Sequence, residues 1–370
     1  MKLLSIIVPT YNMEAYLVRC LDSVTNKILP NTLEVIVVND GSKDKSLNIA
    51  RSYQTFRPDI ISIIDKPNGN YGSCINEGLK EAQGKYIKIL DADDWYNTDS
   101  LKVFLEKLVD VDSDLIITDF TEVYNKHKKY IGYSFPQNEE LDDSIMKRFD
   151  FARLKMHAIT YKTELLRKNN YIQTVGISHT DEEWMFYPMR FVNTIRFYKL
   201  NLYQYLLGRE GQTMDPKLLI RRYECFVYIL IRMVNEYSQW EIGQLTECQD
   251  KYLMNRILIL ARSAYKIALL GVDNQLNNDV LNKLDSVIYS NRKLYVALEN
   301  MPIHEMLPYK FIKYYHKTHE VPNRIIRQLY QFMESVHSFI KTRFYVFYYL
   351  HYLCIIRMKY SLNKLNSKVR

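Results

Sequence analysis

The sequence has little cysteine and no long hydrophobic run. Five cysteines occur in 370 residues, widely spaced and never as a C-x-x-C pair, so we expect neither a disulfide framework nor a zinc site. The longest uncharged apolar run, residues 344–356, is shorter than the about 18–20 residues that span a bilayer as a helix. The apolar run at residues 3–8 is broken by Ser5 and is typical of a strand rather than a signal peptide. We therefore expect a cytoplasmic protein.

A dinucleotide fingerprint is also missing. No G-x-G-x-x-G follows any of the early apolar runs, which disfavours a NAD-dependent oxidoreductase.

Positive charge is in excess only near the end of the sequence. The formal net charge is +8, and residues 321–370 carry nine basic residues against Glu334 alone. Residues 1–320 therefore have no net charge, which argues against a nucleic-acid partner. The basic segment at 321–370 instead favours binding to an anionic membrane surface. Five apolar residues at 4-3-4-3 spacing predict one helical face there: Ile325, Leu329, Phe332, Val336 and Phe339. The aromatic run at 344–353 fits an interfacial helix, and equally a buried helix of a second domain.

Short apolar runs alternate with helical patterns over the first 120 residues. Strands are expected at 4–8, 33–38, 60–64, 86–90 and 115–118, and helices at 14–25, 44–53, 71–83 and 99–108. This alternation predicts an α/β fold with a mainly parallel sheet flanked by helices. From Pro216 onward only helical patterns remain. We therefore expect a catalytic or binding domain at 1–215 and an all-helical region at 216–370.

Polar residues follow three of the expected strands, where ligands bind in such sheets. The first is followed by Pro9, Thr10 and Tyr11, and the second by Asn39 and Asp40. The fourth ends in Asp91-Ala92-Asp93-Asp94. Three carboxylates so close together repel one another unless a cation lies among them, and oxygen ligands suit Mg²⁺ or Mn²⁺. An acidic helix N-terminus is the alternative explanation of this cluster.

Together these motifs resemble the family 2 inverting glycosyltransferases of the GT-A fold. The resemblance covers roughly residues 1–120 and rests on residues 5–12, 37–42, 68–78 and 84–94. It implies a nucleotide-sugar donor, with UDP the commonest nucleotide in the family. Asn39 departs from the family pattern, because many members have an Asp there, which leaves the base preference open. The implied donor-binding residues are Pro9, Thr10, Tyr11, Asn39, Asp40, Lys66, Asn76, Asp91, Ala92 and Asp93, with Asp91, Asp93 and Asp94 on a Mn²⁺ or Mg²⁺ ion.

Inverting transfer requires a carboxylate that accepts the proton of the acceptor hydroxyl. By resemblance to the family, Asp181 in the sequence His179-Thr180-Asp181-Glu182-Glu183 is expected to be this base, with Glu182 as the alternative. An acidic first turn of a helix also explains these residues. Residues 205–213 resemble the segment that closes the active site in relatives, which implies that Arg209 pairs with the departing diphosphate, although a surface arginine on a turn has the same pattern.

The sequence thus predicts a metal-dependent inverting glycosyltransferase. As in the assembly of bacterial surface polysaccharides, we expect a glycan or lipid-linked glycan acceptor and a peripheral location on the inner face of the cytoplasmic membrane. Two alternatives remain open. One is a degenerate member that acts as a scaffold or glycan-binding protein. The other is a sugar nucleotidyltransferase, which should have a Gly-rich loop with a basic residue where Pro9-Thr10-Tyr11-Asn12 stands.

Overall fold

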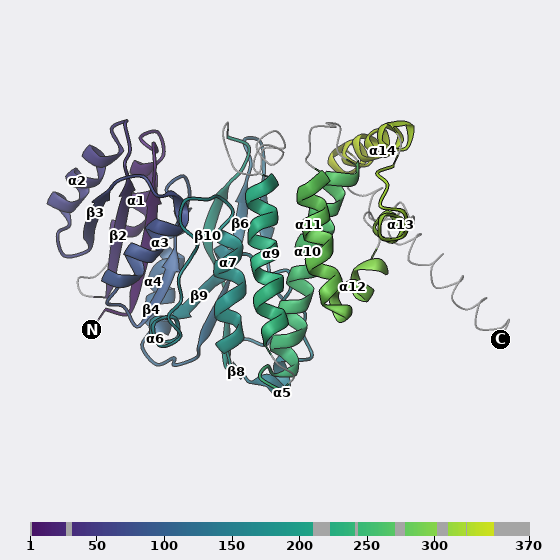
Figure 1. Cartoon of the computed structure of the whole chain (residues 1–370). Coiled ribbons are helices and arrows are strands. Elements are labelled where there is room, and N and C mark those ends of the chain that lie inside the picture. The colour runs from purple at the N-terminus through teal and green to yellow at the C-terminus, as the bar shows by residue number, and fades with distance from the viewer. Residues whose placement is uncertain are drawn as a thin grey trace. The chain divides into compact units, whose positions relative to one another are not determined.

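The computed structural model places ten strands in one sheet (Figure 1). It describes residues 2–26, 32–209, 223–240, 243–270, 278–301, 310–322 and 324–343. The strand order is β3-β2-β1-β4-β9-β6-β10-β5, with β7 beside β6 and β8 beside β10. The strands are β1 (Leu4–Thr10), β2 (Leu33–Asp40), β3 (Ile61–Lys66), β4 (Tyr86–Ile89), β5 (Trp95–Tyr96), β6 (Leu115–Val123), β7 (Lys128–Ile131), β8 (Glu140–Leu141), β9 (Ile159–Lys162) and β10 (Ile195–Leu206).

Most of these strands run in the same direction. β3, β2, β1 and β4 are mutually parallel. β9 is antiparallel to both β4 and β6, and β10 is parallel to β6. The carboxyl ends of six strands therefore meet at one edge of the sheet, and the predicted mainly parallel sheet is confirmed.

Helices connect and cover the strands. Those within the sheet region are α1 (Leu17–Thr25), α2 (Ser46–Phe56), α3 (Asn70–Glu81), α4 (Thr98–Leu108), α5 (Asp143–Met146), α6 (Thr163–Lys168) and α7 (Asp181–Phe186), with 3₁₀ turns η1 (Met156–Ala158) and η2 (Tyr187–Phe191). The later helices are α9 (Tyr223–Gln239), α10 (Glu247–Leu270), α11 (Asn278–Ser290), α12 (Arg292–Glu299), α13 (Phe311–Thr318) and α14 (Arg324–Arg343). All described regular elements from Tyr223 onward are helices, as predicted.

The central strands are buried on both faces, which explains their continuous Ile and Val runs. Every residue of β2 and β4 is buried. α1 contacts α2 and α4, whereas α3 crosses over β1 and β2 on its way from β3 to β4. Right-handed crossovers place α3 on the opposite face, because the chain reverses its direction across the sheet there.

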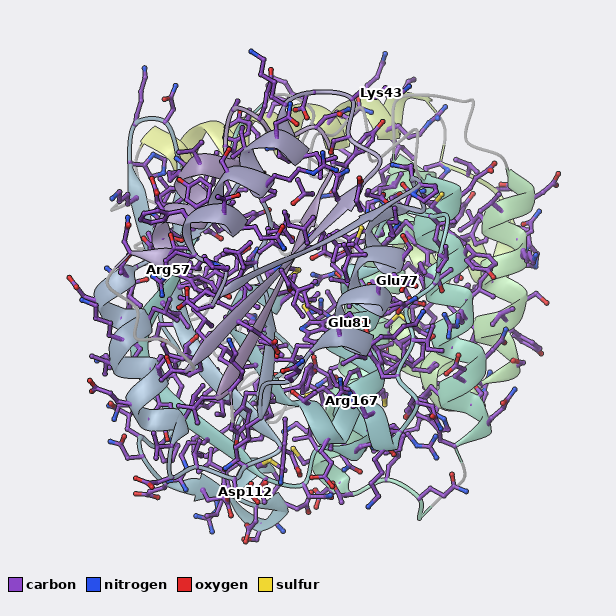
Figure 2. All side chains as sticks on the ribbon, turned by 90° about the vertical axis from the view of Figure 1, so that its left-hand side faces the viewer. Lys43, Arg57, Glu77, Glu81, Asp112 and Arg167 are labelled. Carbon is purple, nitrogen blue, oxygen red and sulfur yellow. The ribbon has the colours of Figure 1, made fainter. Side chains whose placement is uncertain are left out.

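Arg167 ties the end of α3 to α6. Its Nη2 donates to the carbonyl oxygens of Leu79 at 3.0 Å and Ala82 at 2.5 Å. Figure 2 shows the Arg167 label below those of Glu77 and Glu81 of α3. A guanidinium at this position satisfies carbonyls that a helix end leaves without partners. α3 is thereby fixed at its C-terminal end, and its N-terminal end lies at the ligand edge.

Two compact units make up the structure. The first comprises Met1–Ala261 and Asn282–Val296, and the second Arg262–Leu281 and Ala297–Arg370. α9 and the first part of α10 belong to the unit that contains the sheet. The domain boundary expected after residue 215 remains a prediction. Among the described helices, none is both long and apolar enough to cross a membrane.

β10 is the main element that the sequence did not predict. It is 12 residues long and pairs with β6, β5 and β8. Its register against β6 shifts between Tyr198 and Asn201 and again before Tyr203. Such irregularities interrupt the alternation of buried and exposed side chains by which a strand is recognised.

We predict that Gly84→Ala destabilises the fold. A Cβ at Gly84 would lie 2.4 Å from Ser5 N and 2.6 Å from Leu4 C, and backbone atoms of the central β1 cannot move aside. The Gly84 N–H also donates to Ser5 Oγ at 2.7 Å and to the buried Glu34 at 3.0 Å. The free energy of unfolding should fall by about 2–3 kcal/mol, measured by urea denaturation. Gln83→Ala, at an exposed neighbour, is the control, and equal midpoints for the two variants would contradict this account.

Candidate active site

The carboxyl ends of β1, β2 and β3 lie side by side. Thr10 pairs in register with Asn39, and Asp40 with Lys66. Thr10, Asn39 and Asp40 are buried, whereas Tyr11 exposes 44% of its surface. The first two predicted strand tips, including the half-buried Pro9, are therefore brought together at one edge.

Asp40 is held in place by two donors. Its Oδ1 accepts from the ammonium of Lys66 and from Gly69 N, the latter at 2.9 Å. The turn after it uses Gly41 at φ +71°, and a Cβ there would lie 3.0 Å from Asn68 N. Asn39 donates instead to Asp65 at 2.7 Å. In this structure Lys66 therefore holds Asp40, an acid of the predicted donor site, in place by an ion pair.

Two tyrosines and a backbone amide hold the acids after β4. Tyr71 of α3 donates to Asp91 at 2.8 Å. Tyr203 of β10 donates to Asp94 at 2.7 Å, and its oxygen accepts from Asp91 N at 3.1 Å. Leu206 N donates to the other oxygen of Asp94 at 2.7 Å. The unpredicted β10 is therefore the element that organises the acidic loop.

The electrostatics of this loop favour a bound cation. Burial, followed by the charge of Asp93, raises the pKa of Asp91 to about 7. Burial raises the pKa of Asp94 well above its usual value, with Asp93 and Asp91 as further causes. A divalent ion among these carboxylates would offset both the lost hydration and the mutual repulsion.

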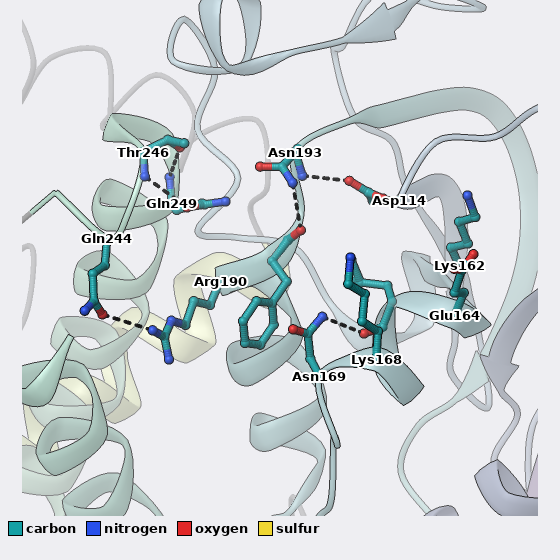
Figure 3. A pocket seen from close by; sticks show the side chains of 12 residues that line it. Asp114, Lys162, Glu164, Lys168, Asn169, Arg190, Asn193, Gln244, Thr246 and Gln249 are labelled. Carbon is teal, nitrogen blue, oxygen red and sulfur yellow. Dashed lines mark hydrogen bonds between the residues drawn. The ribbon is translucent and has the colours of Figure 1, made fainter. Parts of the chain in front are cut away.

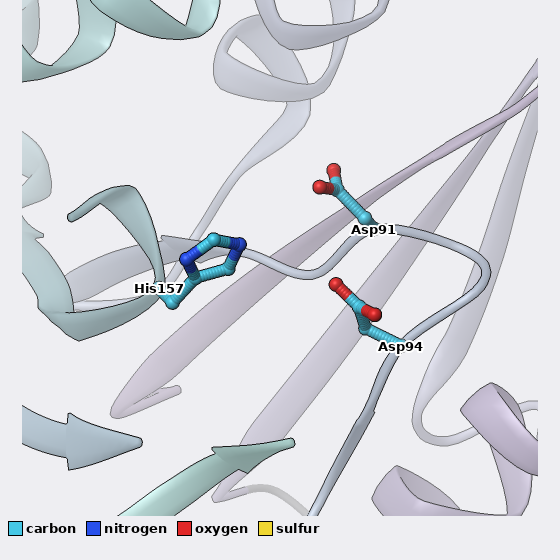
Figure 4. A group of neighbouring side chains, drawn as sticks. All are labelled: Asp91, Asp94 and His157. Atoms are coloured by element: carbon cyan, nitrogen blue, oxygen red, sulfur yellow. The ribbon is translucent and has the colours of Figure 1, made fainter. Parts of the chain in front are cut away.

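His157 completes a group with metal-ligand geometry. Ligating atoms of Asp91, Asp94 and His157 all lie within 4.8 Å of one another, and one ring nitrogen of His157 is turned toward the carboxylates (Figure 4). Burial, followed by the charge of Lys88, lowers the pKa of His157 to about 3, so its imidazole is neutral and able to bind a metal. These three residues fit a divalent ion. The sequence analysis missed His157 because no local pattern marks it.

A buried lysine holds the backbone at His157 in place. Lys88 is fully buried in β4 and donates to the carbonyl oxygens of His157 at 2.8 Å and Ile159 at 3.0 Å. Burial lowers the pKa of Lys88 to about 7. The two hydrogen bonds from Lys88 Nζ fix η1 against the end of β4.

Asp93, also predicted as a metal ligand, has a different partner. Arg209 Nε donates to Asp93 Oδ2 at 2.5 Å, and its guanidinium lies 5.5 Å from the centre of the Tyr16 ring. The structure thus brings the predicted Arg209 to the acidic loop. The positive charge of Arg209 therefore compensates Asp93, the one acid of the loop that is not grouped with His157.

α7 begins with three acids in different environments. Burial, followed by the charge of Glu182, raises the pKa of Asp181 to about 6. The charge of Asp181 in turn raises the pKa values of Asp91 and Tyr71, so its half-buried carboxylate is close enough to the acidic loop to act on it electrostatically. Among the described residues, no hydrogen bond or ion pair from another side chain reaches it. Glu182 is paired with Arg256, and Glu183 with Arg232.

Asn76 and Ala92 are two further residues that the sequence predicted to bind the donor. The Asn76 amide donates to Gln173 O at 2.9 Å and accepts from Gln173 N at 2.8 Å, so it joins α3 to the chain before α7. Ala92 is 2% exposed. Lys66 and Asn76 line a cavity of about 740 Å³ that extends toward Val175. Binding of a donor by Asn76 or Ala92 stays a prediction.

A second pocket lies at the opposite edge of the sheet (Figure 3). It has a volume of about 440 Å³ and includes Asp114, which precedes β6, and Lys162, which ends the antiparallel β9. Its polar side chains bond largely to one another and to nearby backbone, as for Arg190 with Gln244 at 3.1 Å. None of the predicted site residues lines it.

Comparisons with known proteins find similarity to glycosyltransferases over most of the chain. The chain is 23% identical to the glycosyltransferase GlyA of Streptococcus pneumoniae over 85% of this chain and 49% of that protein. It is 26% identical to the hyaluronan synthase of Pasteurella multocida over 86% of this chain and 34% of that protein. The chain therefore spans half or less of the length of these curated relatives.

Solved structures show the same fold. The crystal structure of Staphylococcus aureus TarS 1–349 in complex with UDP-GlcNAc superposes with a TM-score of 0.60 at 22% identity. The match covers 86% of this chain and 93% of that one, and the shared fold is the GT-A fold. The model of the family "Glycosyl transferase family 2" matches residues 5–171, which include the strand tips and the acidic loop. Residues 5–171 therefore form a domain that is similar to those of glycosyl transferase family 2.

Proposed function

We propose that the chain is an inverting glycosyltransferase that moves a sugar from a UDP-sugar to a hydroxyl group of a glycan. One observation carries the proposal. In the first turn of α7 both Glu182 and Glu183 are paired with arginines, whereas among the described residues no side chain bonds to Asp181, whose charge acts on Asp91 of the acidic loop. Inverting transfer requires one carboxylate that can accept a proton, close to the residues that would hold the metal at the donor diphosphate.

The donor fits the edge formed by β1, β2 and β4. Tyr11 offers an aromatic face to a base, and Asp40 offers a fixed acceptor to a base N–H or ribose hydroxyl. Relatives support uridine as the base, because TarS was solved with UDP-GlcNAc and with UDP. TarS is named as a poly(ribitol-phosphate) β-N-acetylglucosaminyltransferase, which supports a surface glycan as the acceptor here.

Asp91, Asp94 and His157 would hold the divalent ion. When bound, this ion neutralises negative charge on the diphosphate of the donor. An imidazole beside carboxylates favours Mn²⁺ over Mg²⁺, since Mg²⁺ demands oxygen ligands.

The protein residues move the proton and compensate charge. Asp181 accepts the proton of the acceptor hydroxyl as its oxygen forms a bond to the anomeric carbon. The bond from that carbon to the diphosphate oxygen breaks on the opposite side, which inverts the configuration. Arg209, now paired with Asp93, can form charge-assisted hydrogen bonds with the departing diphosphate.

The exposed face of α14 supports a location at an anionic membrane, where lipid-linked acceptors reside. Ile325, Leu329, Phe332 and Val336 expose 69%, 58%, 69% and 39% of their surfaces, and the predicted helix is present. Phe339 and residues 344–353 lie outside the side chains described. Apolar residues on one face, in a segment of net charge +8, are typical of interfacial helices. We propose a peripheral location on the cytoplasmic side of the membrane.

We predict that UDP stabilises the protein in a Mn²⁺-dependent way. A ligand that binds only the folded state at about 100 times its Kd adds about 2.7 kcal/mol to the free energy of unfolding. The thermal midpoint should rise with UDP and Mn²⁺, and this rise should vanish in EDTA and in Asp91→Asn. The control is Asp99→Asn, at a side chain 93% exposed. A rise with UDP that is unchanged by EDTA would refute the metal assignment.

We predict that Asp181→Asn lowers the rate of UDP release from UDP-GlcNAc, with water as acceptor, by about 10²–10⁴-fold. UDP binding should be unchanged. In the wild type, kcat/KM should fall below about pH 6, because protonation of Asp181 at its raised pKa removes the proton acceptor. Glu164→Gln, at an exposed position, is the control. A wild-type rate in Asp181→Asn would assign the base elsewhere.

We predict that Leu329→Ser/Phe332→Ser weakens binding to vesicles of anionic phospholipid. Sedimentation with the vesicles measures the effect, which should be about tenfold because two large apolar groups no longer enter the interface. Phe56→Ser removes an equally exposed ring, 74% accessible, from α2 and should leave binding unchanged. Equal binding by all three proteins would exclude α14 as the membrane contact.

A further inference from the structure

The turn that carries Asp181 has few local determinants of its conformation. α7 has six residues and no side-chain cap at its N-terminus. The residue two before it, His179, has φ +69°. A helix this short is not stable by itself, so contacts from elsewhere in the chain must fix the direction of the Asp181 side chain.

Arg256 of α10 supplies such a contact. Its Nε donates to Glu182 Oε2 at 3.0 Å, and its Nη2 donates to the same oxygen. Its Nη1 donates to the carbonyl oxygens of Ala152 and Leu154, each at 3.3 Å. Arg256 is only 4% exposed. One buried guanidinium thus joins the first turn of α7 to the segment at residues 152–154. That segment leads into η1, and η1 contains His157.

The neighbouring Glu183 is anchored separately. It is fully buried and accepts from Thr174 N at 2.7 Å and from Arg232 Nη1 of α9 at 2.7 Å. Both acids that follow Asp181 are therefore paired with arginines from the helices after residue 223. Each of the two glutamate carboxylates is thereby engaged by a guanidinium, and Glu183 is held inside the fold.

We propose that Arg256, acting through Glu182, is a positioning residue that directs the Asp181 carboxylate toward the acidic loop. This inference rests on the proposed function, because it requires Asp181 to be the base. It assigns to α10, which lies beyond the matched family domain, a part in the chemistry of that domain. Arg256 does not itself touch the reacting atoms.

The charges around Asp181 support this role. After burial, Glu182 raises the pKa of Asp181, whereas Arg256 and Lys155 lower it. Asp91, Tyr71 and Tyr205 are the groups on other elements that interact with this charge, since it raises the pKa of each. Because Glu182 and Arg256 act in opposite directions, changing either one should shift the apparent pKa of the base in a direction that is known in advance.

The test compares Arg256→Met, Arg256→Lys and Glu182→Gln with the wild type. The assay is UDP release from UDP-GlcNAc at saturating donor and fixed Mn²⁺, with water as acceptor. We expect Arg256→Met to lower kcat by about 10–100-fold with UDP affinity within twofold of wild type. Arg256→Lys should recover part of that loss. Glu182→Gln, which keeps its shape and tests the pair even if Arg256→Met fails to fold, should lower kcat less than Asp181→Asn.

The pH profile provides a readout that loss of stability alone would not change. The acidic limb of kcat/KM should move to higher pH in Arg256→Met and to lower pH in Glu182→Gln. Arg232→Met removes the other arginine that anchors α7. It should leave the pH of the acidic limb of kcat/KM unchanged, even if it lowers the value of kcat/KM at all pH values.

Three results would overturn the inference: kcat within twofold of wild type in both Arg256 variants, coincident acidic limbs in all variants, or a loss in Glu182→Gln as large as in Asp181→Asn. A wild-type rate in Asp181→Asn, in contrast, would refute the proposed base and the inference together. Loss of activity in Asp181→Asn with unshifted Arg256 variants would refute the inference alone.

Discussion

The crowding of three carboxylates at the end of β4 is the constraint on which the site depends. Burial raises the pKa values of Asp91 and Asp94, so both acids need donors or a cation to remain charged. Those donors come from distant parts of the chain: Tyr71 of α3, Tyr203 and Leu206 N of β10, and Arg209 beyond it. The sheet order, with β10 only three places from β4, is what brings them within reach.

The same constraint explains which parts of the fold and site could be predicted from the sequence. The strands up to β4 are continuous apolar runs followed by polar tips, and both features are local. β10 could not be predicted, because its shifts in register against β6 interrupt its alternation. His157 could not be found either, since nothing beside it in the sequence suggests a ligand. The position of its backbone depends on Lys88 of β4, the strand next to β9 in the sheet but 69 residues earlier in the sequence.

The choice of base shows a similar limit. Asp181, Glu182 and Glu183 are adjacent acids, and only the resemblance to the family favours Asp181 over Glu182 in the sequence. In the structure Arg256 and Arg232 bind the two glutamates, and this difference in pairing is the basis on which we propose Asp181. Both arginines belong to helices that follow the family domain. The helical region thus contributes to the site as well as to the bulk of the molecule.

A crystal structure with UDP-GlcNAc and Mn²⁺ tests the central claim most directly, because anomalous scattering locates the metal. The account predicts the anomalous peak among Asp91, Asp94 and His157. It also predicts that Asp181 is the carboxylate closest to the anomeric carbon, on the side opposite the diphosphate. A peak elsewhere, or Glu182 released from Arg256 and placed at that carbon, would contradict it.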